Sequence, residues 1–335
     1  MILVKPIKEE GKMLKTKITE MFDITYPFFG GTMMYISTPA FVSAVSEAGG
    51  IGILASAMYR SKESFKNAIK EVKDKTDKPF GVNINLFPMM QPIDNNEYMD
   101  VIIEEGVKVV ETSGHRAPDD IVARLKPEGI KLIHKCVGVR YAKKVESVGV
   151  DVVTVVGFEN GGATGTLDVT TLCLVPAVVS AVNIPVVGGG GIVTGQSIAA
   201  VLALGAEGVI MGTRILCTEE CPIHDNLKKS LLEASETDTV LMLRPYGNTH
   251  RCWISEATKK VKALEEENAP FEKIIPLIEG PKTLSMIRDG DLKSGFISCG
   301  QGIGQVNRIL PVKDLFDQLA DELKDANNRL DQIIG

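Results

Sequence analysis

The 335-residue sequence predicts an α/β protein, a (β/α)8 TIM barrel with an appended helical subdomain. Over the first 220 residues, short apolar runs of strand type alternate with amphipathic stretches of helical type, and eight such runs occur. This alternation favours a parallel sheet with right-handed crossovers. Eight strand–helix units in about 200 residues favour closure into a barrel. An open doubly wound sheet, which usually carries fewer strands, is the alternative.

The predicted strands are apolar runs, and several follow a glycine or proline that ends the preceding helix. The run VVTVV at 152–156 is apolar throughout, as expected of a strand covered on both faces. We predict strands at residues 26–29, 51–54, 80–85, 107–111, 131–136, 152–156, 184–187 and 208–211. We predict helices between them at residues 39–48, 62–75, 96–105, 117–128, 140–148 and 195–204.

The amino-acid composition and the hydrophobic period change after Cys221. Lysine and glutamate become more frequent, the period is helical and strand signals are few. We therefore divide the chain into a (β/α)8 barrel at 1–222, a helical substrate-side subdomain at 223–294 and a return segment with the C-terminal helix at 295–335. Helices are predicted at residues 225–234, 255–268, 271–279 and 313–330. The last of these has one apolar stripe, so we expect it to pack on the barrel.

Charge and hydropathy exclude two classes of protein. The formal net charge is −6 and no basic face is visible, which argues against nucleic-acid binding. Residues 169–206 contain no charged side chain, but Pro176, Pro185 and the glycines at 188–191 interrupt them, so no membrane span is predicted. The first residues, which include Lys5 and Lys8, lack the apolar core of a signal peptide.

The six cysteines form no CxxC pair and have no histidine doublet nearby, so no metal site is predicted. Scattered free thiols are typical of a reducing cytoplasm. We therefore expect a cytoplasmic protein that acts on a small-molecule substrate. The sequence leaves the oligomeric state open, with a homodimer among the options.

Two glycine-bearing turns follow the last two predicted strands, in IPVVGGGGI at 184–192 and VIMGTR at 209–214. In barrels, the turns after strands seven and eight commonly hold a phosphate, because their backbone N–H groups can point at the anion. The predicted phosphate contacts are Gly189, Gly190, Gly191, Gly212 and Thr213. The alternative for either turn alone is a tight strand–helix connection without a ligand. The GxGxxG dinucleotide fingerprint is incomplete here.

The ends of earlier strands carry further candidates. Gly30, Gly31, Thr32 and Met33 follow the first strand, where two glycines would let a flat ring system lie against the backbone. Asn83 ends the third strand and can donate and accept hydrogen bonds. A plain loop and a strand cap are the alternatives for these two sites.

Lys135 ends the fifth strand, and a lysine in a barrel mouth needs an anionic partner. A phosphate or the edge of a reduced flavin would serve, and a salt bridge to Glu111 or Glu159 is the alternative. A glycine-rich loop with Gly157, Gly161 and Gly162 follows the sixth strand.

None of the four histidines is paired with a serine or cysteine nucleophile motif. His115, which follows the fourth strand, has the best position for contacting substrate. It stands with Lys135 as a candidate catalytic residue.

Together these segments resemble the nitronate monooxygenase family, which includes flavin-dependent enoyl-ACP reductases and NADH:quinone reductases. The matching stretches run in order over residues 26–224, and the likeness is greatest to the quinone-reductase branch. The resemblance implies FMN in the barrel mouth. Gly31 and Met33 would border its ring, Asn83 and Lys135 would meet its polar edge, and the two late turns would hold its phosphate.

The sequence departs from the family pattern at Ala163. The family loop usually has a histidine at this position, after a glycine pair, and that histidine is the expected catalytic base or acid. Alanine cannot transfer a proton, so nitronate oxidation ranks second. The first hypothesis is an FMN enzyme driven by NADH or NADPH that reduces a quinone, an enoyl compound or another small acceptor. The third is a non-flavin barrel that acts on a phosphorylated substrate.

Overall fold

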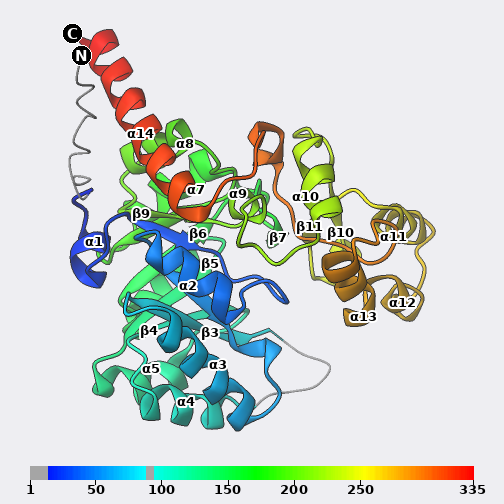
Figure 1. Ribbon diagram of the computed structural model, residues 1–335, viewed down its shortest axis with the longest axis horizontal. Helices are drawn as coiled ribbons and strands as arrows, with labels where there is room; N and C mark the ends of the chain where they lie inside the picture. The colour runs from blue at the N-terminus through cyan, green and yellow to red at the C-terminus, as the bar shows by residue number, and fades with distance from the viewer. Residues whose placement is uncertain (1–13, 88–93) are drawn as a thin grey trace, which may run out of the picture.

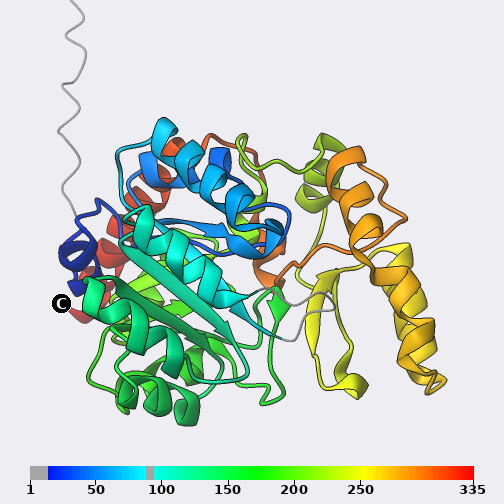
Figure 2. The same cartoon turned by 90° about the horizontal axis from the view of Figure 1, so that it is seen from below.

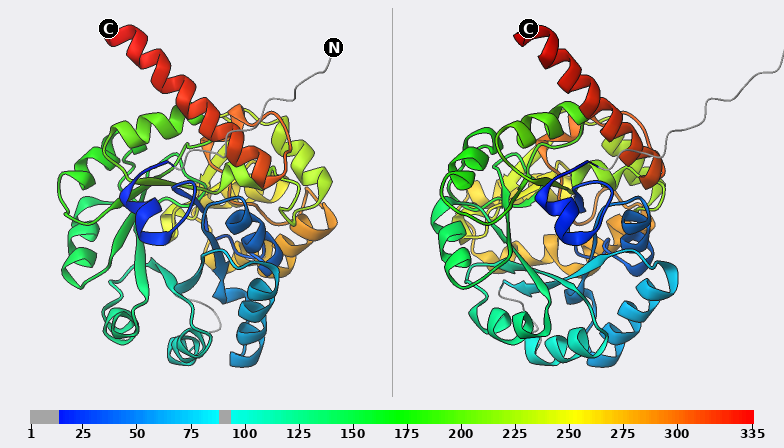
Figure 3. Two further views of the ribbon diagram at one scale, coloured as in Figure 1. Left: turned by 60° about the vertical axis from the view of Figure 1, so that its left-hand side comes forward. Right: turned by 90° about the vertical axis from the view of Figure 1, so that its left-hand side faces the viewer.

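The computed structural model describes residues 14–87 and 94–335. Lys5 and Lys8 lie outside this part of the chain. Eight parallel strands form one sheet in the order β1-β9-β8-β6-β5-β4-β3-β2. A bridge between Phe29 of β1 and Ile51, just before β2, joins the two ends of the sheet. The sheet is therefore a TIM barrel (Figures 1 and 3), and the open-sheet alternative is wrong.

All eight predicted barrel strands are present. They are β1 (Phe28–Gly30), β2 (Gly52–Ala55), β3 (Phe80–Leu86), β4 (Val109–Gly114), β5 (Lys131–Cys136), β6 (Val152–Val156), β8 (Val186–Gly189) and β9 (Gly208–Met211). The helices around them are α2 (Pro39–Glu47), α3 (Lys62–Lys75), α4 (Asn95–Glu104), α5 (Asp119–Leu125), α6 (Val139–Ser147), α7 (Thr171–Val179), α8 (Gly195–Ala203) and α9 (Thr213–Leu216).

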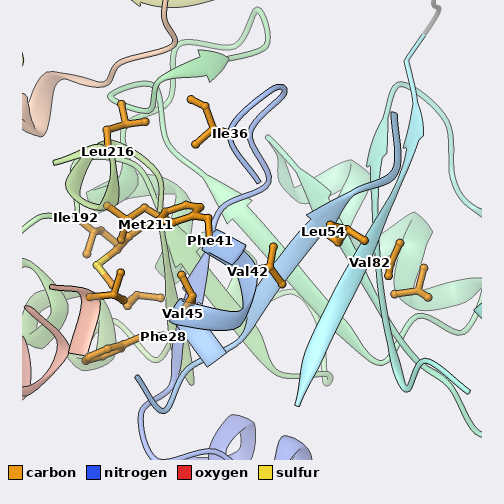
Figure 4. Packing of buried hydrophobic residues seen from close by; sticks show 14 of the residues in the cluster. Phe28, Ile36, Phe41, Val42, Val45, Leu54, Val82, Ile192, Met211 and Leu216 are labelled. Atoms are coloured by element: carbon orange, nitrogen blue, oxygen red, sulfur yellow. The ribbon is translucent and has the colours of Figure 1, made fainter. Parts of the chain in front are cut away.

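Two apolar layers hold the barrel together. Inward-facing side chains, among them Phe29, Ile53 and Ile133, fill its interior. Helix α1 (Lys17–Phe22) adds Ile18 and Phe22 to this cluster and lies across the amino-terminal end of the strands (Figure 3). The outer layer packs strands against helices, as Figure 4 shows for Phe28 and Met211 on the strands and Phe41, Val42 and Val45 on α2. A filled barrel leaves only its carboxyl end for a ligand.

The C-terminal helix α14 (Val312–Ile334) packs back on the barrel, as predicted (Figure 1). Phe316 meets the Phe28 ring edge-on at 5.3 Å between centroids. Glu322 accepts a hydrogen bond from the Gly195 N–H at 2.8 Å, at the start of α8. These contacts attach the first half of α14 to β1 and to α8.

The segment after Cys221 contains more strand than predicted. Strands β10 (Thr239–Met242) and β11 (His250–Trp253) form an antiparallel hairpin, and β11 also pairs with β7 (Gly162–Ala163) of the loop after β6. The hairpin lies beside the carboxyl end of the barrel (Figure 2). The expectation of few strands was wrong, because two four-residue strands interrupt the helical period. The three-part division of the chain stays a prediction.

The predicted helices of this segment are present as α10 (Asp225–Leu232), α11 (Glu256–Glu266) and α12 (Ile275–Ile278), followed by α13 (Gly280–Leu284). A π-helical turn follows at Ser285–Asp289, and 3-10 turns occupy Ser56–Met58, Lys126–Glu128, Arg244–Tyr246, Phe271–Lys273 and Gln301–Gln305. Among the described residues, no helix is long and apolar enough to span a membrane.

Candidate active site

A cavity of about 1290 Å³ opens at the carboxyl ends of the barrel strands. Its walls come from the turns after the strands, from the β10–β11 hairpin and from the return segment near Ser298. A site for one drug-sized ligand has about 300–1,000 Å³. The volume therefore suits two ligands, such as a cofactor and a substrate, better than one.

Most of the predicted site residues meet in this cavity. Those in its lining are Gly31, Thr32, Met33, Asn83, His115, Lys135, Gly161, Gly162, Gly190, Gly191, Gly212 and Thr213. Gly30, Gly157 and Gly189 are not part of the lining. A Cβ on these three would meet Val45, Thr171 and Ile210, respectively. Their contact with a cofactor stays a prediction.

Glu111 ties three of the predicted residues together beneath the cavity floor. Its side chain on β4 is fully buried. One carboxylate oxygen accepts hydrogen bonds from the Thr32 hydroxyl at 2.6 Å and the Asn83 amide at 2.8 Å. The other faces the Lys135 ammonium at 3.0 Å. The lysine therefore has the carboxylate partner that the sequence offered as an alternative, but its ammonium has three N–H donors and can still bind a ligand.

The two late turns face each other across one corner of the cavity. Gly190 and Gly191 have φ values of +99° and +70°, which side chains rarely allow. A Cβ on Gly212 would meet only the Met33 sulfur, at 3.9 Å, so this glycine faces open space. The Thr213 hydroxyl accepts a hydrogen bond from the Gly300 N–H at 2.8 Å, which links the turn to the return segment. The turns leave room for a phosphate close to the backbone.

The barrel supplies two histidines to the cavity wall. His115 is exposed, and its ring meets Phe87 edge-on at 4.8 Å. His134 on β5 is buried, and its Nδ1 lies 2.7 Å from the Thr112 hydroxyl. Burial lowers the pKa of His134 to about 4, against a raising effect of Glu111. His134 is thus a neutral, hydrogen-bonded core histidine.

The mouth of the cavity is apolar with a few cations. Four large apolar side chains are both exposed and part of the lining, namely Met34, Tyr141, Leu167 and Phe271. Arg116 and Lys144 also line the mouth, in exposed ion pairs with Asp120 and Asp119. Exposed pairs are weak and can be exchanged for a ligand anion. The mouth suits a molecule with an apolar body and a negative charge.

The comparisons with known proteins agree with this arrangement. Residues 15–322 match the family model described as nitronate monooxygenase. The chain belongs to the nitronate monooxygenase family. It is thus an enzyme, a flavin-dependent oxidoreductase, and FMN is the flavin typical of the family. The non-flavin barrel is excluded as a hypothesis.

Three relatives show how far the likeness extends. A Rhodococcus jostii (strain RHA1) protein named (3aS,4S,5R,7aS)-5-hydroxy-7a-methyl-1-oxo-octahydro-1H-indene-4-carboxyl-CoA dehydrogenase is 32% identical, over 96% of this chain and 98% of its own. FabK from Thermotoga maritima superposes with a TM-score of 0.89 at 36% identity, over 96% of this chain and 99% of its own. Nitroalkane oxidase from Streptomyces ansochromogenes has a TM-score of 0.79 at 27% identity, over 93% and 99%.

The structure also shows what stands beside Ala163, where the family pattern has a histidine. Ala163 lies on β7, directly opposite His250 of β11. His250 lines the cavity, and its Nε2 lies 2.9 Å from the Ser298 hydroxyl. Sequence reasoning missed His250 because it expected few strands in this segment. The signal was present as two β-type runs around the turn RPYGN at 244–248.

Proposed function

We propose that the protein binds FMN in the cavity and uses NADH or NADPH to reduce a quinone, an enoyl compound or another small acceptor. One observation carries the proposal. The two glycine turns, Asn83 and Lys135 were predicted separately from the sequence, and they line a single cavity larger than one cofactor needs, with Glu111 joining Asn83 and Lys135 beneath it. A cofactor and a second substrate can thus meet there without a change of fold.

The residues present fit FMN. Gly190, Gly191 and Gly212 leave a backbone-lined corner for the phosphate, and Thr213 adds a hydroxyl. Lys135 would place a positive charge beside the polar edge of the ring, with Asn83 next to it. When bound, FMN supplies hydride transfer, and the protein orients and tunes it. Glu111 would hold both side chains in position from below.

The mouth of the cavity favours an acceptor with an apolar body. Tyr141, Leu167 and Phe271 would contact that body, and Arg116 and Lys144 would meet a phosphate or carboxylate. An acyl-CoA thioester combines both features, and the Rhodococcus relative is named for a ring-bearing carboxyl-CoA. Within the acceptors proposed, an enoyl thioester therefore fits the mouth better than a small nitronate does.

Nitronate oxidation with O₂ remains the second candidate. The likeness to nitroalkane oxidase supports it, and the absence of a histidine at position 163 weighs against it. Steady-state oxygen uptake separates the two. We expect NAD(P)H to drive faster turnover than propionate 3-nitronate, and the reverse ranking would favour the nitronate function.

The first test is the visible spectrum of the purified protein, followed by anaerobic addition of NADH or NADPH. We expect a flavin band that bleaches within seconds of addition and returns when an acceptor such as menadione or crotonyl-CoA is added. A flavin band that neither nucleotide bleaches would contradict the proposed reductant. Flavin extracted from the protein identifies FMN by mass.

A further inference from the structure

We propose that His250, held by Ser298, exchanges the proton that accompanies hydride transfer to the acceptor. The inference rests on the proposed function and assigns one catalytic residue within it. This residue comes from the hairpin of the appended segment rather than from the barrel.

The backbone register places His250 at the wall of the cavity. β11 pairs antiparallel with β7, so that His250 is opposite Ala163 and Arg251 is opposite Gly162. Directly opposed residues of such a pair have their Cβ atoms about 4.5–5.5 Å apart, on the same face of the sheet. Because Ala163 has only a methyl group, the space next to it is open to the imidazole. Both residues line the cavity.

Two contacts fix the orientation of the ring, and Gly162 leaves room for it. Nε2 lies 2.9 Å from the Ser298 hydroxyl oxygen. Phe296 meets the ring edge-on, with centroids 5.4 Å apart and an interplanar angle of 81°. The Cε1 atom lies 3.9 Å from the position that a Cβ would take on Gly162. The glycine thus lets the ring approach the backbone of the loop.

The surroundings keep the ring neutral. Burial alone lowers the pKa of His250 to about 4, because the charged form loses its hydration. The neighbouring cation on the strand, Arg251, donates to the Phe158 carbonyl instead, and successive side chains on a strand point to opposite faces. Glu159 and Asp168 act on the pKa of Arg251. A neutral imidazole carries a proton on one nitrogen and a lone pair on the other.

The lining also contains two other histidines and Lys135, and each of these has a neighbour of its own. His134 is buried on β5 against Thr112. Lys135 is paired with Glu111. His115 is exposed and rests on Phe87, a residue next to the chain outside the described part. Among the four histidines, His250 alone combines a place in the lining with a hydroxyl partner from the return segment.

The proton and the electron pair balance as follows for an enoyl acceptor. FMN, when bound and reduced, would supply the hydride and both electrons to one carbon of the double bond. The N–H bond of His250 breaks as a C–H bond forms at the neighbouring carbon. Nε2 of His250 takes the Ser298 hydroxyl proton, so the proton that is given up is the one on Nδ1, and the Ser298 oxygen takes a proton from water, which leaves as hydroxide. For a quinone, the new bond is O–H.

The test separates the two half-reactions of the FMN-loaded protein by anaerobic stopped flow. In His250→Gln, we expect flavin reduction by NAD(P)H to stay within about threefold and flavin reoxidation by crotonyl-CoA or menadione to fall by about 100-fold or more. In Ser298→Ala, we expect about a tenfold loss in reoxidation and a shifted pH profile. His224→Asn is the matched control, because His224 caps α10 through Nδ1, asparagine caps equally well, and His224 is absent from the lining.

A relocation variant sharpens the test. In the double variant Ala163→His with His250→Ala, a histidine enters the same space from the opposite strand, and we expect reoxidation to recover at least about tenfold over His250→Ala alone. The proposal is overturned if His250→Gln leaves reoxidation unchanged. It is also overturned if flavin binding and the rates of both half-reactions fall together, because that result would mean that His250 supports the structure of the site and not the proton transfer.

A readout without turnover separates this inference from the proposed function. The protein has four histidines, so His→Gln variants assign every imidazole resonance in a proton NMR spectrum. We expect crotonyl-CoA to shift the His250 resonance and to leave His224 unmoved, whichever reductant the flavin uses. An unmoved His250 resonance at saturating ligand overturns the inference. Failure of NADH and NADPH to reduce the flavin contradicts only the proposed function.

Discussion

The barrel and the β10–β11 hairpin build opposite walls of one cavity in different ways. The barrel residues Asn83 and Lys135 lie on strands that are hydrogen-bonded on both sides and packed in two apolar layers. The hairpin pairs with the two residues of β7 and with the return segment at Ser298, and its small apolar cluster, which includes Met242 and Cys252, is separate from the barrel core. A change in the barrel should therefore affect folding, and a change in the hairpin should affect the site locally.

The largest effect is expected from Gly157→Ala. A Cβ at this position would lie 2.2 Å from both the backbone nitrogen and the hydroxyl of Thr171, where α7 begins. The backbone there cannot move aside cheaply, so we expect a loss of about 3 kcal/mol or more in the free energy of unfolding. Urea denaturation of the apo-protein measures it.

Gly212→Ala is the matched control for Gly157→Ala. The new Cβ would have only the Met33 sulfur nearby, at 3.9 Å. We expect a stability change within about 0.5 kcal/mol and a rise of about tenfold or more in the dissociation constant of FMN, measured by quenching of flavin fluorescence. If both variants lost FMN but neither lost stability, Gly157 would belong to the cofactor site.

The second prediction concerns the buried ion pair of the barrel. Lys135→Met leaves the fully buried Glu111 without its cation. We expect a loss of about 2–3 kcal/mol in stability together with slower flavin reduction. The double variant Lys135→Met with Glu111→Gln should regain most of the stability but not the reduction rate. Unchanged flavin binding and reduction in Lys135→Met would contradict the proposed role of Lys135.

Two pairs of residues, Asn83 with Lys135 and Gly157 with Gly212, show what the sequence could and could not predict. Strand period and strand order place Asn83 and Lys135 at one barrel end, because parallel strands all finish there, and the structure confirms that both line the cavity. The hydrophobic periodicity of a sequence does not show which way a glycine in a turn faces. Gly157 and Gly212 look alike in the sequence, yet one lies against Thr171 and the other faces the cavity.

Pairing between residues far apart in the chain was the second feature that the sequence could not predict. Glu111 was predicted only as one of two partners for Lys135, and its contacts with Thr32 and Asn83 depend on packing across three strands. His250 faces Ala163 across 87 residues of chain through a pairing of two residues. The two β-type runs around the turn at 244–248 indicate a hairpin, but a pairing of only two residues leaves no periodic signal, so the histidine beside Ala163 could not be placed from the sequence.

The third prediction uses pH to probe the barrel wall. Because burial lowers the pKa of His134 to about 4 from a usual 6.5, the unfolded chain takes up a proton between these values and the folded chain does not. Stability should therefore fall as pH drops from 6.5 to 4, by about 2 kcal/mol at pH 5 from this residue. His134→Asn should flatten this slope in thermal unfolding measured from pH 4 to 7. An equal slope in the variant would show that His134 titrates normally.

The smallest effect is expected from Arg251→Lys, which tests the attachment of the hairpin to the barrel. The guanidinium donates to the Phe158 carbonyl at 3.1 Å and to the Thr239 hydroxyl at 3.1 Å, and it stacks on the Phe158 ring at 4.8 Å. A lysine cannot reproduce this planar set of contacts, so we expect a loss of about 1–2 kcal/mol in the free energy of unfolding.

Because the barrel core does not depend on Arg251, the loss should be confined to the hairpin. Hydrogen exchange should quicken at residues 239–253 and stay unchanged in the barrel strands, and the KM for the acceptor should rise about fivefold at constant flavin reduction rate. Faster exchange throughout the barrel would mean that the hairpin and the barrel unfold as one cooperative unit. The two walls of the cavity would then differ only in how well the sequence predicts them.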